Sequence, residues 1–413
     1  MSRLGALRER DFRLFFVGQS ASLLGDGMVG VALSFAVLDL TGSVSDLGYV
    51  LAARALPFVG FLLVGGVLAD RISRRTVMVG ADLLRLGSQG VTAGLLISGN
   101  AHVWELAALQ AVGGLASAFF YPAVTGLTPA IVAPHHLQQA NVLRGVSAGA
   151  GGIAGPAVAG VLVATAGAGW ALAADAATFG ISAAALAALR VPPHVRLEVQ
   201  SFLRDLRDGW SEFRSRTWLW TGVCTAGLVV MLAAPFSVLG PAIAKSSLGG
   251  AGAWAGIVAG SSAGGVVGGL LALRLRPRRP FRAAFIAYMP FGSPMVLLAL
   301  HAPAAAIAAL AVVAGAGLTI GNALWETTLQ EQISPAVLSR VASYDWFGSL
   351  AGQPVGMALV GPVALAIGSR PTLIGAWVLI AAANLTVLSL PSVRSVESAA
   401  ARGGEPAVQA LDT

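Results

Sequence analysis

Twelve long apolar segments divide this sequence, and they constrain its fold more than any other feature. A helix that crosses a bilayer needs about 20 predominantly apolar residues, and each segment meets or nearly meets that length. With 56% hydrophobic and 11% charged residues, a chain of 413 residues is too apolar for a water-soluble globular protein. The sequence therefore predicts an all-α membrane protein with twelve transmembrane helices. Their expected limits are residues 12–38, 47–69, 76–98, 103–132, 137–166, 169–189, 218–244, 254–273, 281–300, 302–329, 338–367 and 372–390.

The distribution of basic residues predicts the orientation of these helices. Arginines cluster in loops at residues 71–75, 190–216 and 274–282, whereas the loops on the other side offer only Lys245 and Arg370. Basic loops face the cytoplasm, so we expect a multi-pass protein of the bacterial inner membrane with both termini in the cytoplasm. The formal charge of +7 resides in these loops and forms no basic face, which argues against nucleic acid as a partner.

An internal repeat indicates two similar halves. Pro134-x-x-Leu137 with Gly155 and Gly160 recurs as Pro335-x-x-Leu338 with Gly356 and Gly361, at a constant shift of 201 residues. We therefore expect two six-helix bundles, at residues 1–190 and 218–391, and a disordered cytoplasmic tail at residues 392–413.

The connection at residues 191–217 is the one long polar stretch. Apolar residues recur there at helical spacing, which predicts an amphipathic helix at the cytoplasmic membrane surface. The alternatives are a plain linker and a helix with a regulatory role. The recurring residues are Phe202, Leu206, Trp210 and Phe213.

The loop between the second and third segments places an acid among bases. It contains the pattern Gly66-x-Leu68-Ala69-Asp70-Arg71-x-x-Arg74-Arg75. Membrane orientation explains the arginines but not Asp70. The pattern resembles the loop between the second and third helices of the major facilitator superfamily of transporters, with Ser73 where glycine is usual. The resemblance implies that Asp70 faces the start of the eleventh helix, where the helix dipole favours a carboxylate, and forms a latch that closes the cytoplasmic side.

The fifth segment carries a second pattern, Gly151-x-x-x-Gly155-Pro156-x-x-x-Gly160. Proline removes a helix hydrogen bond and glycines permit close packing, so a bent and tightly packed helix is expected. The pattern resembles the antiporter motif of exporters in the same superfamily, with Ala159 where glycine is usual. Together with residues 204–210 and 338–346, it resembles the drug-efflux and siderophore-efflux branch, which favours export.

Charged residues inside the apolar segments are the strongest functional indication, since each costs about 2.5–3.5 kcal/mol at the centre of a membrane helix. Asp82 and Arg85 are three residues apart on one helix and are predicted to pair. Arg144 and Asp345 occupy equivalent positions in the repeat. They either pack the protein interior or anchor the two surfaces that move against each other during transport. The complete set is Asp26, Asp82, Asp175, Glu326 and Asp345 against Arg54, Arg85 and Arg144.

Asp26 has no basic residue within helical reach on its own segment. A lone desolvated carboxylate suits a group that takes up and releases a proton, so Asp26 is the first candidate for proton coupling. The alternatives are that it faces a water-filled cavity or pairs with Arg54. Glu326 and Asp345 are further coupling candidates, and Glu326 is also a candidate for contact with a cationic substrate.

The resemblance also implies that the first, fourth, seventh and tenth segments line a central cavity. Aromatic faces with a few hydrogen-bonding groups on these segments suit a large amphipathic cation. The candidates are Gln19, Phe119, Phe120, Tyr121, Asn322 and Trp325.

These features predict a secondary active transporter that exports a hydrophobic or amphipathic small molecule by proton antiport and alternating access. It would act as a monomer among membrane lipids, with the proton gradient as energy source and neither cofactor nor metal, because no ATP-binding loop is present and Cys224 is the only cysteine. It would not be an enzyme, since no histidine pairs with an acid at a catalytic or metal-binding spacing inside a segment. Uptake of a nutrient, a non-transporting sensor and a lipid-acting membrane enzyme are the alternatives.

Overall fold

The structure, a computed structural model, describes residues 5–190 and 210–390, and every regular element in these ranges is helical. Within them it describes the backbone but not the side chains of residues 63, 66–71, 125, 134, 335–336 and 339–340. The expected tail and most of the expected linker helix lie outside the described residues. Residues 210–217 are the described part of that linker; residues 210–215 are helical, and α8 begins at Thr217.

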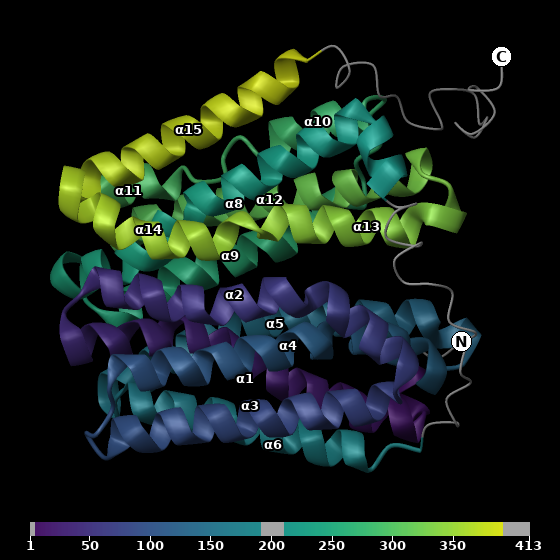
Figure 1. Ribbon diagram of the computed structural model, residues 1–413, viewed down its shortest axis with the longest axis horizontal. Helices are drawn as coiled ribbons and strands as arrows, with labels where there is room; N and C mark the ends of the chain where they lie inside the picture. The colour runs from purple at the N-terminus through teal and green to yellow at the C-terminus, as the bar shows by residue number, and fades with distance from the viewer. Residues whose placement is uncertain (1–4, 191–209, 391–413) are drawn as a thin grey trace. The chain divides into compact units, whose positions relative to one another are not determined.

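The chain divides into two compact units. Unit 1 comprises Met1–Leu197, Val238–Ala259 and Met357–Pro362, and unit 2 comprises Glu198–Ser237, Gly260–Gly356 and Val363–Thr413. Six long helices of unit 1 agree with the first six expected segments to within a few residues, and Figure 1 shows them running lengthwise beside one another. They are α1 (Arg10–Thr41), α2 (Val44–Arg71), α3 (Arg74–Ile97), α4 (Val103–Ile131), α5 (Leu137–Thr165) and α6 (Ala168–Ala187).

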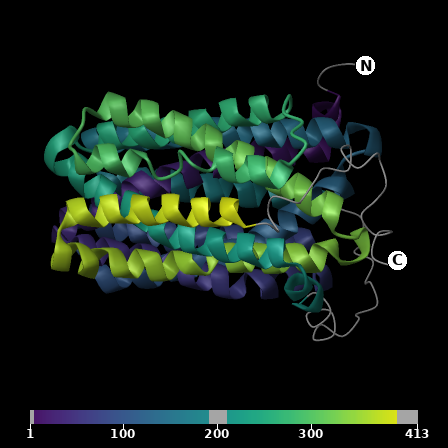
Figure 2. The ribbon, with the colours of Figure 1, turned by 90° about the horizontal axis from the view of Figure 1, so that it is seen from above.

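The helices of the second half of the sequence follow the expected order, and α15, yellow in Figures 1 and 2, is continuous. Two expected spans are each divided into two helices, so the prediction of a continuous helix is wrong there. Pro290, Gly292 at φ 86° and Pro294 separate α10 from α11. Helix α13 ends at Leu350, four residues before Pro354, a residue that cannot donate a helix hydrogen bond. The helices are α8 (Thr217–Ile243), α9 (Ala251–Ala272), α10 (Pro280–Ala287), α11 (Pro294–Ala299), α12 (Ala304–Gln332), α13 (Pro335–Leu350), α14 (Gly352–Ile367) and α15 (Ser369–Ser389).

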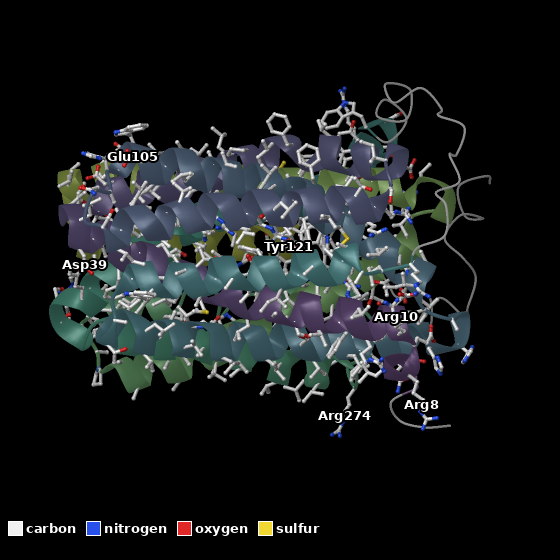
Figure 3. The ribbon with its side chains drawn as sticks, turned by 90° about the horizontal axis from the view of Figure 1, so that it is seen from below. Arg8, Arg10, Asp39, Glu105, Tyr121 and Arg274 are labelled. Atoms are coloured by element: carbon white, nitrogen blue, oxygen red, sulfur yellow. The ribbon has the colours of Figure 1, made fainter. Side chains whose placement is uncertain are left out.

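Ten helical segments among the described residues are long and apolar enough to cross a membrane. The polar exception in unit 1 is α3, which carries Asp82 and Arg85 near its middle. Figure 3 shows Asp39 and Glu105 at one end of the helices of this unit, Arg8 and Arg10 at the opposite end, and Tyr121 between them. Charges thus mark the two ends of unit 1, as expected where spans meet water.

Glycines bring α1 and α5 into direct backbone contact. A Cβ placed on Gly155 would lie 2.7 Å from Gly27 Cα and 2.6 Å from the Leu24 carbonyl oxygen, and one placed on Gly151 would lie 2.8 Å from the Leu23 carbonyl oxygen. Real Cβ atoms do not approach so closely, so these two positions require glycine for the present packing. Gly151 and Gly155 of the motif therefore form a packing surface against α1, the helix that carries Asp26.

We expect Gly155→Ala to destabilise the protein by about 1–3 kcal/mol, because the added methyl group forces α1 and α5 apart. Gly145→Ala on the same helix is the matched control, since nothing lies within 4 Å of a Cβ at that position. The control should keep or slightly raise the melting temperature in detergent, because alanine favours helix. Equal melting temperatures for the two variants would contradict the close contact.

Candidate functional site

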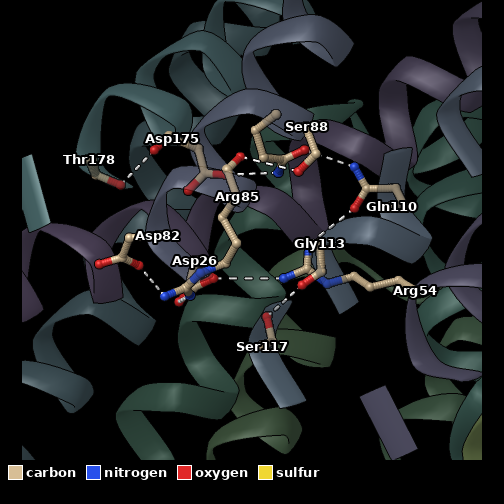
Figure 4. A network of polar contacts seen from close by, with 11 residues as sticks. Asp26, Arg54, Asp82, Arg85, Ser88, Gln110, Gly113, Ser117, Asp175 and Thr178 are labelled. Carbon is tan, nitrogen blue, oxygen red and sulfur yellow. Dashed lines mark hydrogen bonds and ion pairs between the residues drawn. The ribbon is translucent and has the colours of Figure 1, made fainter. Parts of the chain in front are cut away.

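Unit 1 contains a buried polar cluster in the middle of its helices, shown in Figure 4. Apolar clusters lie on either side of it, one around Phe12 and Phe15 and one around Leu33 and Leu47. Five helices, α1, α2, α3, α4 and α6, contribute to it. The polar cluster consists of Asp26, Arg54, Asp82, Arg85, Gln89, Gln110 and Asp175.

Arg85 on α3 is the centre of the ionic part of the polar cluster. Its guanidinium pairs with Asp82 one turn earlier and lies 3.5 Å from Asp26 Oδ2, while Arg54 Nη2 lies 3.7 Å from Asp26 Oδ1. The rings of Phe120 and Phe179 lie 4.1 and 4.4 Å from the Arg85 guanidinium carbon, an arrangement that gives cation–π attraction. Charges removed from water are thus compensated by opposite charges and ring faces.

Amide side chains form the other part of the polar cluster. Arg54 Nη1 donates to Gln110 Oε1 at 3.1 Å, Gln110 Nε2 donates to Gln89 Oε1 at 2.8 Å, and Gln89 Nε2 donates to Asp175 Oδ2 at 2.8 Å. Asp175 is 0% exposed. A continuous chain of hydrogen bonds therefore joins the ionic part to a fully buried carboxylate.

The geometry decides two of the predictions about charges. The predicted pair of Asp82 and Arg85 is confirmed. The premise that Asp26 is a lone carboxylate is wrong, because Arg54 and Arg85 approach it from two other helices. The alternative that Asp26 pairs with Arg54 agrees with the structure, whereas its second partner, Arg85, was not expected.

Arg85→Gln should destabilise unit 1 by about 3–5 kcal/mol, because it leaves the 0% exposed carboxylate of Asp82 without a counter-charge. The double variant Asp82→Asn with Arg85→Gln should recover much of that loss, since Asp26 keeps Arg54. Thermal unfolding in detergent measures both. A double variant that is less stable than Arg85→Gln would show that loss of the ion pair does not cause the destabilisation.

Unit 2 contains a cavity of about 320 Å³. Its walls are mostly apolar and aromatic, and no basic side chain is among the described residues that line it. Two carboxylates, Glu326 and Asp345, face it together with the amides Asn322 and Asn384. The aromatic lining consists of Phe285, Tyr288, Phe291, Trp325 and Trp346. This combination suits an aromatic or aliphatic cation.

The two carboxylates of the cavity have different surroundings. Asp345 accepts hydrogen bonds from Trp325 Nε1 at 3.0 Å and from Ser349 Oγ at 3.4 Å. Glu326 is exposed to the cavity, and no ion pair or hydrogen bond to it occurs among the described residues. Glu326 is thus the carboxylate that is available to a ligand.

The structure places the six predicted cavity residues in different environments. Asn322 and Trp325 line the cavity of unit 2. In unit 1, Tyr121 is 44% exposed and its ring contacts Phe58, whereas Phe120 is 2% exposed and packs under Arg85. Two others complete the set, Gln19, which is buried on α1, and Phe119, whose ring contacts Phe61.

The loop predicted to act as a latch is described only in part. The side chains of Gly66, Asp70 and Arg71 lie outside the described residues, so the contact of Asp70 stays a prediction. Arg74 Nη1 donates to the Gly126 carbonyl at 2.8 Å, and Arg75 donates to the Leu186 carbonyl at 3.0 Å and to the Ala187 carbonyl. The bonds of Arg75 place a cation at the carboxyl end of α6, where the helix dipole favours it.

Two other predicted positions have packing contacts. Gly160 of the fifth segment lies against the start of α9, where an added Cβ would come 2.7 Å from Ala255 Cβ. Arg144 donates to Thr128 Oγ1 at 3.1 Å and lies 5.9 Å from the centre of the Phe15 ring. Packing is therefore established for Arg144, and a role in transport stays a prediction.

Sequence reasoning missed the amides Gln89, Gln110 and Asn384 and the hydroxyl of Tyr288, which donates to Asn322 Oδ1 at 2.8 Å. A polar side chain inside an apolar segment was the signal that could have found them, as it found the charges. Among the described residues, no group of histidine, cysteine or acidic side chains could hold a metal ion.

The helices, the buried polar cluster and the acidic aromatic cavity define a multi-pass membrane transporter for small molecules, not an enzyme. Residues 15–356 match the family profile of the Major Facilitator Superfamily. The chain belongs to this family. The chain is 29% identical over 374 residues to enterobactin exporter EntS of Escherichia coli O1:K1, covering 85% of this chain and 84% of the relative.

A second relative is macrolide efflux protein A of Streptococcus pyogenes, 25% identical over 246 residues, which cover 58% of this chain and 60% of the relative. A crystal structure of the nucleoside transporter NupG aligns with a TM-score of 0.74 and 13% identity, covering 92% of this chain and 99% of that structure. At that identity the structural likeness shows the fold alone.

Proposed function

We propose that this transporter exports a hydrophobic or amphipathic cation from the cytoplasm in exchange for protons. The observation that carries the proposal is the cavity of unit 2, where two carboxylates and five aromatic rings meet without a basic side chain among the described lining residues. A cation gains both charge attraction and contact with ring faces there. Relatives named as an enterobactin exporter and a macrolide efflux protein support the direction of transport.

Antiport follows from competition at the same carboxylate. A proton and an organic cation each neutralise Glu326, so that binding of one favours release of the other. Asp345, held by Trp325 and Ser349, is the second candidate for this exchange. Asp26 is the weaker candidate, because two guanidinium groups already neutralise it.

The transport cycle that we propose is alternating access between two bundles, residues 1–190 and 218–391, joined by the connection at residues 191–217. Asp70, Arg71 and Gly66 would form the cytoplasmic latch with Arg74 and Arg75. We place both termini in the cytoplasm from the arginine-rich loops. The protein would work as a monomer in the inner membrane, with the proton gradient as its only energy source.

Glu326→Gln should weaken binding of tetraphenylphosphonium, an aromatic cation, by about tenfold, equivalent to about 1.4 kcal/mol. Binding of triphenylphosphine oxide, a neutral aromatic probe, should change little, because the rings of the cavity remain. Glu105→Gln is the control, since it removes one negative charge from a residue that does not line the cavity. Equilibrium binding to the purified protein measures the affinity of each of the two variants for each of the two probes.

Transport direction is measured in inside-out membrane vesicles. Export predicts that tetraphenylphosphonium accumulates inside them when the lumen is acidic, and that Glu326→Gln accumulates less. Accumulation in right-side-out vesicles instead would favour the alternative, uptake. Equal loss of the neutral and cationic probes in Glu326→Gln would show that the carboxylate does not recognise charge.

A further inference from the structure

The polar cluster of unit 1 holds more carboxylates than cations among its described members. Its carboxylates are Asp26, Asp82 and Asp175, and its guanidinium groups are Arg54 and Arg85. If all five were ionised, the cluster would keep one uncompensated negative charge inside the bilayer. Such a charge is costly enough that the group normally becomes neutral.

Asp175 is the carboxylate that lacks a cationic partner. Asp82 pairs with Arg85, and Asp26 lies between Arg54 and Arg85. Asp175 forms no ion pair within the described part of the chain, and its Oδ2 accepts one hydrogen bond from the neutral amide of Gln89. Its Oδ1 is buried, has no hydrogen-bond partner and lies against Gly25 of α1, where a Cβ would collide with it.

The direction of the hydrogen bonds in the chain is fixed by Arg54. A guanidinium can only donate, so Gln110 must accept from Arg54 with its oxygen and donate with its nitrogen. Gln89 then accepts from Gln110 and donates to Asp175 Oδ2. This order of hydrogen bonds orients both amides. Because Oδ2 of Asp175 accepts from Gln89, Oδ1 is the atom of Asp175 that can carry a proton.

We infer that Asp175 is a proton-binding site, occupied in the present arrangement, and that Gln89 and Gln110 are positioning residues that connect it to the ion pairs of Asp26. The proton leaves when a rearrangement gives the carboxylate a cation or water as partner. Asp26, Arg54, Asp82 and Arg85 are the charged groups around it, from α1, α2 and α3. The role in transport rests on the proposed proton antiport, whereas occupancy of the site does not.

Asparagine has the shape of a protonated aspartic acid, so Asp175→Asn should leave the melting temperature of the full protein in detergent nearly unchanged. Asp82→Asn is the matched comparison on the neighbouring helix, and it should lower the melting temperature clearly because it removes the partner of Arg85. The infrared carbonyl band of a protonated carboxylic acid should be present in the wild type and lost in Asp175→Asn. A melting temperature that falls as far in Asp175→Asn as in Asp82→Asn, with the band unchanged, would overturn the inference.

Transport in liposomes separates this inference from the proposed function. Asp175→Asn should keep exchange of tetraphenylphosphonium without a gradient and reduce transport driven by a pH gradient to the level of empty liposomes. If the wild type shows pH-driven transport and Asp175→Asn matches it, the transport role of Asp175 is wrong. If the wild type shows no pH-driven transport while the infrared band is lost in Asp175→Asn, the antiport proposal fails and the proton site stands.

Discussion

The compensation of charge by Arg85 is the interaction on which unit 1 depends. The helix that carries it, α3, is long enough to cross a membrane but is less apolar than the neighbouring helices. Its place among the spans depends on the compensation of its charges. Asp82 and Arg85 pair with each other, and Arg85 also contacts Asp26 and two phenylalanine rings. A helix that is too polar to enter lipid alone is stable here because other helices supply its partners.

The two units use acidic residues in different ways. In unit 1 guanidinium groups or amides contact every buried acid of the polar cluster, so its carboxylates are structural unless a proton or a cation is exchanged. In unit 2 the described lining of the cavity has acids without bases. The sequence repeat emphasises the contrast, because Arg144 and Asp345 occupy equivalent positions with opposite charge. The excess of acids in the second unit is the basis of the cation binding proposed for its cavity.

The sequence predicts what depends on one helix at a time. Apolar length located the limits of most spans, and the spacing of Asp82 and Arg85 predicted their pair. The breaks near Pro290 and Pro354 were missed because composition alone ignores the lost backbone donor. Arg54 was expected as one possible partner of Asp26, whereas Arg85 lies on α3, where no spacing along α1 could show it. Asn322 and Trp325 were found on one helix, whereas Tyr288 and Asn384 reach the same cavity from other helices.

The different surroundings of the two cavity carboxylates suggest how a cation and a proton can be exchanged without disturbing the rest of unit 2. Asp345 is held by Trp325 and Ser349, so a change of its charge would break hydrogen bonds inside the protein. Glu326 has no such bonds among the described residues, so replacing a proton on it by a ligand cation alters only the cavity. One positive charge replaces another there, and the net charge of the cavity stays constant. This constancy keeps the energy of the two loaded forms similar, which antiport requires.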